Sequence, residues 1–231
     1  MCAAPAPLTG PVEDYLKAIY DLERVGVPAA TNDIADRLAI SPASVSGMVR
    51  RLADQGLITH EPYRGVRLTI EGRSAALRTL RRHRILECYL TAVLAYPWDR
   101  VHDEAERLEH AASEELIERM AAALGDPVHD PHGAPIPTRD GRVEESALRP
   151  LSEAEVGERV RVRQVHDEDG DRLRYLAELG IRPGALVRIL DRAPFEGPIT
   201  LWVDASGGGA SRAVGIGLAR EVLVEGIPDK Q

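Results

Sequence analysis

Apolar side chains in the first third of the chain recur with the spacing of short amphipathic helices. Between Val12 and Arg24 they occupy the i, i+3, i+4 and i+7 positions that form one face of a helix. After a break that contains glycine and proline, the polar run 31–33 predicts the N-cap of a second, short helix. Ser41 and Pro42 predict the start of a third helix, because serine is a good N-cap and proline is favoured at the first helical position.

Two short β-prone runs follow the third helix, which is expected to end near Gly56. Residues 57–60 and 66–70 flank a Tyr-Arg-Gly turn at 63–65 and therefore predict a β-hairpin. Three helices followed by a hairpin is the element order of a winged helix-turn-helix. We expect residues 1–72 to form this domain, with 42–54 as the helix that enters the major groove of DNA.

The middle of the chain predicts two longer helices and an irregular segment. Residues 71–93 and about 100–123 are both amphipathic. Residues 125–149 are rich in proline, glycine and histidine and lack periodicity, which predicts a loop leading into a linker. We expect a helical domain with a trailing linker over residues 73–148.

Short β-like runs dominate the rest of the chain, residues 149–231. They lie at 160–165, 186–190, 199–203 and 221–224, and glycine-containing turns bound them. A small β-barrel is the simplest way to close strands of this length. The expected fold class is therefore mainly α with β: a winged helix-turn-helix, a helical domain and a small barrel.

Composition restricts the class of protein further. The chain has 231 residues, of which 44% are hydrophobic and 29% charged, an ordinary globular composition. No apolar run approaches the length of a membrane span, and the first ten residues lack the basic start and apolar core of a signal peptide. Two cysteines, Cys2 and Cys88, exclude a disulfide framework and a four-cysteine zinc module, so we expect a cytoplasmic protein.

Charge is distributed unevenly along the chain. The formal net charge of −8 argues at first against a nucleic-acid partner. However, the segment from Thr31 to Arg84 has ten basic and five acidic residues, a net charge of +5. The segment from Asp99 to Glu155 has six basic and fifteen acidic residues, a net charge of −9. The basic segment coincides with the predicted DNA-binding domain.

Small polar residues begin the predicted recognition helix and allow it to approach base edges closely. Arginines further along the helix and at the hairpin tip can reach phosphates. The candidate DNA-contacting residues are Ser41, Pro42, Ala43, Ser44, Ser46, Gly47, Arg50, Arg51 and Arg64. The alternative is a compact domain without DNA contacts, which the local positive charge disfavours.

Two predicted helices carry histidines and carboxylates at helical spacing. His102, Glu106, Glu109 and His110 fall within an arc of about 100° if one helix carries them all. His83 and Glu87 are four residues apart on the preceding helix. Such groups are costly to bury without charge compensation, which a divalent cation supplies. Oxygen and imidazole ligands without thiolate favour Mn²⁺ or Fe²⁺. The alternative is a solvated helix face stabilised by His–Glu pairs.

Other chemistry is disfavoured. The chain has no His-Glu-x-x-His motif and no separate general base, so a zinc hydrolase is not expected and no catalytic residue is assigned. Cys88 falls on a predicted helix and is interpreted as a core residue. His60, His129 and His132 are interpreted as structural or solvated.

These features together resemble the diphtheria-toxin-repressor family of metal-dependent transcriptional regulators, which includes iron-dependent repressors and the manganese transport regulator. The resemblance covers nearly the whole chain. It rests on residues 13–20, the turn at 41–42, and residues 81–84, 101–110 and 130–137. Residues 179–184 and 192–195 are similar to the SH3-like domain shared with FeoA-type proteins.

The resemblance implies two metal sites per subunit. The primary site would use Asp14, Glu106, Glu109 and His110. The ancillary site would use His83, Glu87, His102 and an acidic ligand at Asp167, with Glu168 and Asp169 as neighbouring candidates. Iron regulators usually have methionine and cysteine at the positions of Asp14 and Glu106, whereas the manganese regulator has carboxylates. The manganese regulator's second N-terminal carboxylate falls on Lys17, so its two-metal centre cannot be copied here.

The resulting expectation is a metal-activated homodimer that binds double-stranded operator DNA and regulates metal-ion uptake, most simply in response to Mn²⁺. An iron(II)-responsive repressor of the same family is the main alternative. A metal buffer or iron-transport accessory protein, a metal-assisted hydrolase and a metal-independent winged-helix regulator are further alternatives. No membrane and no small organic substrate is expected as a partner.

Overall fold

The computed structural model describes residues 8–24, 26–61, 64–144, 147–166, 169–204 and 208–227. The chain divides into two compact units. The first unit comprises Met1–His83, Leu108–Glu114 and Pro137–Arg142. The second comprises Arg84–Arg107, Glu115–Ile136 and Val143–Gln231.

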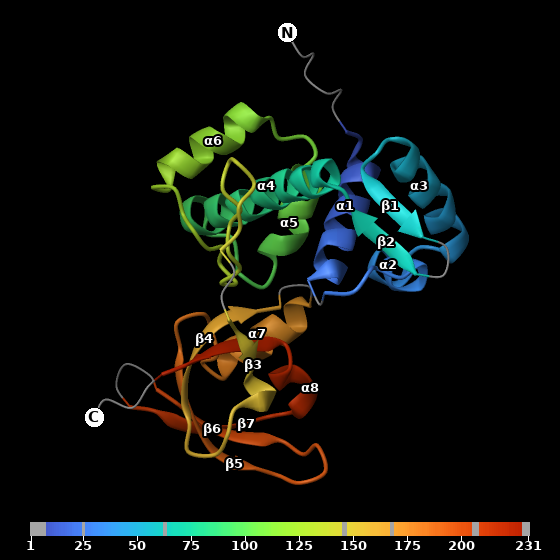
Figure 1. Cartoon of the computed structure of the whole chain (residues 1–231). Helices are drawn as coiled ribbons and strands as arrows, with labels where there is room; N and C mark the ends of the chain where they lie inside the picture. The colour runs from blue at the N-terminus through green and yellow to red at the C-terminus, as the bar shows by residue number, and fades with distance from the viewer. Residues whose placement is uncertain are drawn as a thin grey trace. The chain divides into compact units, whose positions relative to one another are not determined.

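The first unit begins with the predicted order of three helices and a hairpin (Figure 1). Its elements are α1 (Gly10–Glu23), α2 (Thr31–Arg37), α3 (Pro42–Asp54), β1 (Ile58–Glu61) and β2 (Gly65–Leu68). The two strands are antiparallel, with Ile58 opposite Leu68 and Glu61 opposite Gly65. Apolar side chains from all three helices are fully buried, including Leu16, Ile34 and Leu52. The helical faces expected from the sequence therefore form the core of this unit.

The sequence predicted the N-caps of α2 and α3, and the structure agrees with the prediction for α3 only. Ser41 caps α3 by accepting a hydrogen bond from the backbone N–H of Ser44 at 3.3 Å, and Pro42 occupies the first turn. The cap expected at residues 31–33 is wrong by one position. Ala30 is the N-cap of α2 and makes no side-chain cap, while Thr31 is already helical.

The predicted helix at 100–123 is two helices. Helix α4 (Ile70–Leu94) agrees with prediction, but it is followed by α5 (Val101–Leu108) and α6 (Glu114–Ala123). The backbone N–H groups of Ala111 and Ala112 both donate to the carbonyl of Leu108, which closes α5 in a turn. No proline or glycine lies between 108 and 114, but Ser113 followed by Glu114 and Glu115 is typical of a helix start, a signal that the prediction of a single helix did not use.

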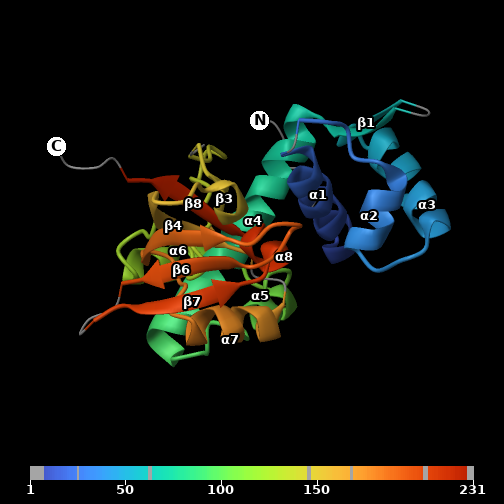
Figure 2. The same cartoon turned by 90° about the horizontal axis from the view of Figure 1, so that it is seen from below.

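The second unit contains an antiparallel six-stranded sheet in the order β3-β8-β4-β5-β6-β7 (Figure 2). The strands are β3 (Arg149–Pro150), β4 (Arg159–Val165), β5 (Leu186–Arg192), β6 (Ile199–Val203), β7 (Ala210–Val214) and β8 (Val222–Gly226). Within the described ranges β3 and β7 do not pair, so the expected closed barrel is wrong and the sheet is open. Register shifts in the β4–β8 and β5–β6 pairs mark bulges or irregularities.

Three helical segments that were not predicted occur between the strands of this sheet. They are the one-turn helix η1 (Leu151–Glu153), α7 (Gly170–Glu178) and α8 (Ile216–Ala219). Leu173 and Leu176 of α7 are buried in the same apolar cluster as the strand residues. Asp169 caps α7 by accepting hydrogen bonds from the backbone N–H groups of Asp171 and Arg172. Figure 2 shows α7 along one side of the sheet.

The segment before β3 approaches β4 closely at Gly133. The backbone N–H of Val165 donates to the carbonyl of His132 at 2.9 Å. Gly133 has φ +88°, and a Cβ at this position would lie 1.9 Å from the carbonyl oxygen of Arg163. Only glycine fits both the backbone conformation and the space.

We therefore expect Gly133→Ala to lower the free energy of unfolding by about 2 kcal/mol or more. Gly184→Ala is the matched control, because Gly184 has φ +92° but nothing within 4 Å of the added Cβ. It should cost only about 1 kcal/mol. Urea unfolding of the three proteins measures the difference, and equal losses in the two variants would contradict the close approach.

Candidate metal centre

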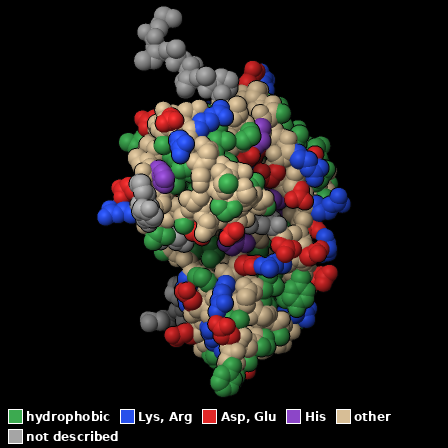
Figure 3. Space-filling view, turned by 90° about the vertical axis from the view of Figure 1, so that its right-hand side faces the viewer, with side chains coloured by type: hydrophobic (Ala, Val, Ile, Leu, Met, Phe, Trp, Pro, Cys, Tyr) green, Lys and Arg blue, Asp and Glu red, His purple; other side chains and the backbone are tan. Residues whose placement is uncertain are grey.

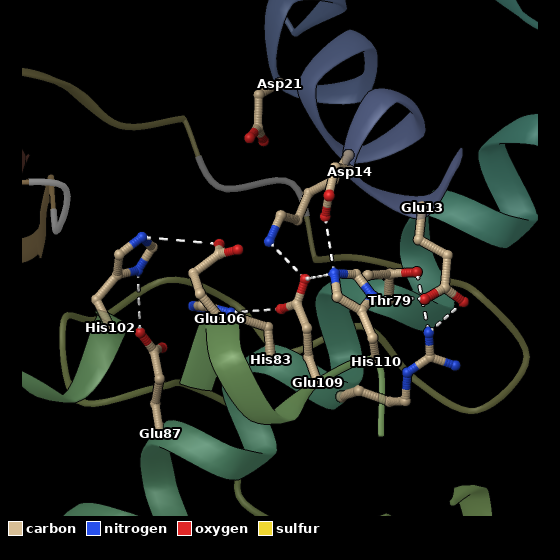
Figure 4. A network of polar contacts seen from close by, with 12 residues as sticks. Glu13, Asp14, Asp21, Thr79, His83, Glu87, His102, Glu106, Glu109 and His110 are labelled. Atoms are coloured by element: carbon tan, nitrogen blue, oxygen red, sulfur yellow. Dashed lines mark hydrogen bonds and ion pairs between the residues drawn. The ribbon is translucent and has the colours of Figure 1, made fainter. Parts of the chain in front are cut away.

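Three predicted ligands of the primary site lie together in the first unit. Asp14 lies on α1, and Glu109 and His110 lie in the turn that follows α5. One ligand atom from each lies within 4.8 Å of the others. His110 Nε2 is 2.8 Å from Asp14 Oδ1 and 3.6 Å from Glu109 Oε1, so one imidazole nitrogen faces two carboxylates (Figure 4). The donor set of two carboxylates and one imidazole fits a hard or borderline divalent cation.

The break after α5 changes how these ligands are brought together. The expectation that His102, Glu106, Glu109 and His110 share one helical face is wrong, because α5 ends at Leu108. His102 and Glu106 remain on the helix, one turn apart. Glu109 and His110 leave the helix and contact residues of α1 and α4 instead. A turn, and not a helical arc, therefore presents the two ligands to Asp14.

Glu109 is the most buried ligand of this cluster. Its side chain has no exposed surface, and its two oxygens accept hydrogen bonds from different segments. His83 Nδ1 of α4 lies 2.6 Å from Oε2, and Lys17 Nζ of α1 lies 2.8 Å from Oε1. Burial alone would raise the pKa of Glu109, but these two hydrogen bonds and the charges of both partners together lower it. Glu109 is therefore held as a carboxylate.

A second carboxylate orients His110. Glu13 accepts a hydrogen bond from His110 Nδ1 at 2.8 Å, and its other oxygen accepts one from Arg82. Burial would lower the pKa of His110, but the hydrogen bond to Glu13 and the charges of Asp14, Glu109 and Glu13 raise it overall. A carboxylate on one ring nitrogen fixes the orientation of the other, which here faces Asp14. Sequence reasoning missed Glu13 and Arg82, although both lie beside predicted ligands in the chain.

The second unit contains a different group of predicted ligands. His102 Nδ1 lies 3.4 Å from Glu87 Oε1, and His102 Nε2 lies 3.8 Å from Glu106 Oε1 (Figure 4). Glu106 thus contacts a member of the predicted ancillary set, and its place in the primary set stays a prediction. Asp167 and Glu168 lie outside the described residues. Asp169 is described, and its carboxylate caps α7.

A third group in the second unit is fully buried and was missed. Glu87, Asp130 and His132 each offer a ligand atom within 4.8 Å of the others. His132 Nδ1 lies 3.8 Å from Glu87 Oε1, while His132 Nε2 donates to the carbonyl of Trp98 at 2.7 Å. His132 also stacks on the Trp98 ring. The interpretation of His132 as a structural residue agrees with these last contacts, but it did not include the neighbouring carboxylates.

The candidate DNA-contacting residues are all exposed. They lie at the start of α3, along its length and at the hairpin tip: Ser41, Pro42, Ala43, Ser44, Ser46, Gly47, Arg50, Arg51 and Arg64. Arg64 forms an exposed ion pair with Glu61 at 3.1 Å. Figure 3 shows Lys and Arg side chains interspersed with Asp and Glu over the visible face. On this face the basic side chains do not form a continuous patch, so the DNA assignment depends on the element order and on the exposure of α3.

Comparisons with known proteins identify the family. Residues 7–66 match "Iron dependent repressor, N-terminal DNA binding domain", residues 69–138 match "Iron dependent repressor, metal binding and dimerisation domain", and residues 149–226 match "FeoA domain". A diphtheria toxin repressor of Corynebacterium efficiens is 34% identical over 195 residues, which cover 80% of this chain and 84% of the relative. This chain belongs to the iron-dependent repressor family. Members are metal-dependent DNA-binding repressors and not enzymes, as expected from the sequence.

Other relatives of this repressor are named for different metals. The iron-dependent repressor IdeR of Mycobacterium leprae is 36% identical over 194 residues, covering 79% of this chain and 84% of the relative. A solved "Manganese-dependent transcriptional repressor complex with manganese" is 40% identical, with a TM-score of 0.86 and coverage of 94% of this chain and 100% of that one. The structure of T. acidophilum IdeR is 29% identical, with a TM-score of 0.76 and coverage of 98% of this chain and 100% of that one.

None of the described helices has the length and apolar character of a membrane span.

Removing the charge of Glu13 tests its role in the repressor. We expect Glu13→Gln to weaken Mn²⁺ binding by about 10- to 100-fold, because the carboxylate that orients His110 is lost while all proposed ligands remain. Glu114→Gln is the control, since Glu114 also accepts a hydrogen bond from Arg82, whereas the hydrogen bond from His110 Nδ1 goes to Glu13. Isothermal titration calorimetry measures both affinities, and equal losses would contradict an orienting role for Glu13.

Cys88 is expected to be unreactive in the folded repressor. Its Sγ donates to the carbonyl of His129, and burial together with the charges of Asp130 and Glu87 raises the pKa of the thiol to about 12. In a Cys2→Ser background, a thiol reagent at pH 8 should modify Cys88 at least about 100-fold more slowly in the native protein than in urea, because the thiolate is the reactive form. Rapid labelling of the native protein would show that this site opens.

Proposed function

We propose that this repressor is manganese-responsive and controls genes of metal-ion uptake as a metal-activated homodimer on operator DNA. The observation that carries the proposal is the cluster of Asp14, Glu109 and His110, which combines carboxylates with imidazole and has no thiolate or thioether. Such a set suits Mn²⁺ and Fe²⁺, and the carboxylate at Asp14 replaces the methionine that the iron regulators usually have. The solved manganese-dependent repressor with a TM-score of 0.86 supports the same choice.

Two ions per subunit are proposed. The primary site comprises Asp14, Glu106, Glu109 and His110, and the ancillary site comprises His83, Glu87, His102 and Asp167. When bound, the primary ion would neutralise the carboxylates that converge there. Asp14 belongs to a helix of the DNA-binding domain, whereas Glu109 and His110 follow α5, so shared ligation links these segments of the first unit. In a dimer, this link would fix the spacing between two copies of α3 on successive major grooves.

The remaining assignments complete the proposal. The exposed residues at the start of α3, with Arg50, Arg51 and Arg64, would contact DNA. The chain would act in the cytoplasm and would be organised as residues 1–72, 73–148 and 149–231. An Fe²⁺-responsive repressor is the second candidate, because relatives at 34–36% identity are named for iron-dependent regulation or as diphtheria toxin repressors.

DNA binding with a metal panel tests the proposal. Sites selected from a random DNA pool with Mn²⁺ are titrated by fluorescence anisotropy at fixed salt, with Mn²⁺, with Fe²⁺ under anaerobic conditions, and with Mg²⁺. We expect Mn²⁺ to tighten binding by about 5- to 150-fold over metal-free protein, the range of ordinary allosteric coupling.

The variant Glu109→Gln should abolish this enhancement, because it removes the buried carboxylate ligand. Glu104→Gln, which changes an α5 carboxylate paired with Arg107, is the control and should retain it. An affinity for DNA that Mn²⁺ and Fe²⁺ both leave unchanged would contradict metal-dependent regulation. Stronger activation by Fe²⁺ would instead select the second candidate.

A further inference from the structure

Lys17 places a positive charge inside the candidate metal centre. It lies on α1, three residues after Asp14, and its side chain is only 14% exposed. Its Nζ lies 2.8 Å from Glu109 Oε1, and Glu109 has no exposed side-chain surface. The chain has only one other lysine, Lys230, among 29 basic residues. A lysine here supplies a compact point charge that contacts the carboxylate through one atom.

Glu109 requires a cationic partner when no metal is bound. An isolated buried carboxylate is strongly unfavourable, and breaking a buried ion pair by removing one partner is destabilising. Arg82, the other guanidinium or ammonium group in this network, donates to Glu13 and Glu114. Lys17 and His83 are the groups that donate to Glu109. The ammonium of Lys17 therefore stabilises the carboxylate in the metal-free protein.

The oxygen that Lys17 contacts is also the one that faces His110, which in turn contacts Asp14. Glu109 Oε1 lies 3.6 Å from His110 Nε2, and that nitrogen lies 2.8 Å from Asp14 Oδ1. Glu109 Oε2 is on the other side, with His83. A divalent ion that binds Asp14 and His110 would therefore compete with the ammonium for Oε1. Two cations on one oxygen repel each other strongly in a buried site.

We propose that Lys17 is a resident counter-ion of Glu109 that a divalent cation must displace, so that Lys17 sets the metal concentration at which the centre fills. The inference rests on the proposed function, because it requires that Asp14, Glu109 and His110 bind the ion. Lys17 is a positioning residue in this scheme, and it is not a ligand. It lowers metal affinity while it keeps the metal-free fold intact.

Calorimetric titration of the full chain with Mn²⁺ at fixed pH and salt tests this inference. Lys17→Met keeps the length of the side chain but removes the competitor, so Mn²⁺ should bind about tenfold more tightly, the ratio that corresponds to one charge-assisted hydrogen bond. Lys17→Arg retains the charge, although its guanidinium has a different shape, so its affinity for Mn²⁺ should lie closer to that of wild type than to that of Lys17→Met. Arg24→Met removes an exposed positive charge at the end of α1 and should change affinity by no more than about twofold.

Thermal unfolding provides a readout that does not depend on metal affinity. Without metal, Lys17→Met should melt at a lower temperature than wild type and Arg24→Met, and Mn²⁺ should raise its melting temperature by more than it raises theirs. If the methionine variant does not fold without metal, Lys17→Gln is measured in the same way.

The outcomes distinguish a failure of the role of Lys17 from a failure of the proposed function. Wild type that binds Mn²⁺, with a folded Lys17→Met that binds it equally or more weakly, would overturn the role of Lys17 alone. Binding that appears only in Lys17→Met would support displacement strongly. If neither protein binds Mn²⁺, both the proposed function and the role of Lys17 fail.

Discussion

The burial of the Glu109 carboxylate is the constraint on which the first unit's polar centre depends. A buried charge must be compensated by fixed partners, and here the partners come from two helices that are distant in sequence. Lys17 approaches from α1 and His83 from α4. Together with Asp14 and His110, they connect the first helix of the DNA-binding domain to the turn after α5. Metal sensing would use a network that the metal-free fold already requires.

The helical faces of the first unit were predictable because they follow from local spacing. Val12, Leu16 and Ile19 repeat on one face of α1 and are all buried. The break between α5 and α6 was missed, since no proline or glycine interrupts the chain there and Ser113 before two glutamates is only a local sign of a helix start. The tertiary contacts of Glu109 and His110 favour the turn. The α7 helix was missed for a related reason. Its sequence is short and highly charged, and only Leu173 and Leu176 pack into the core.

The chemical types of the site were predictable, but their grouping was not. Histidines and carboxylates at helical spacing indicated a divalent cation, and the family resemblance supplied Asp14 from a remote segment. The geometry places His102 with Glu87 and Glu106, and it places Asp14 with Glu109 and His110. The roles of Glu13, Lys17 and Arg82 depend on contacts across more than 60 residues of sequence. Periodicity within one helix contains no information about such contacts.

Glu87 shows how closely the second unit's polar groups depend on one another. Its Oε1 lies 3.4 Å from His102 Nδ1 and 3.8 Å from His132 Nδ1, so a single oxygen lies within ion-pair distance of two imidazoles from different segments. One of these segments begins α5, and the other leads towards the sheet. Any substitution at this position changes both neighbourhoods at once. A substitution of Glu87 is therefore constrained by the surroundings of both histidines together.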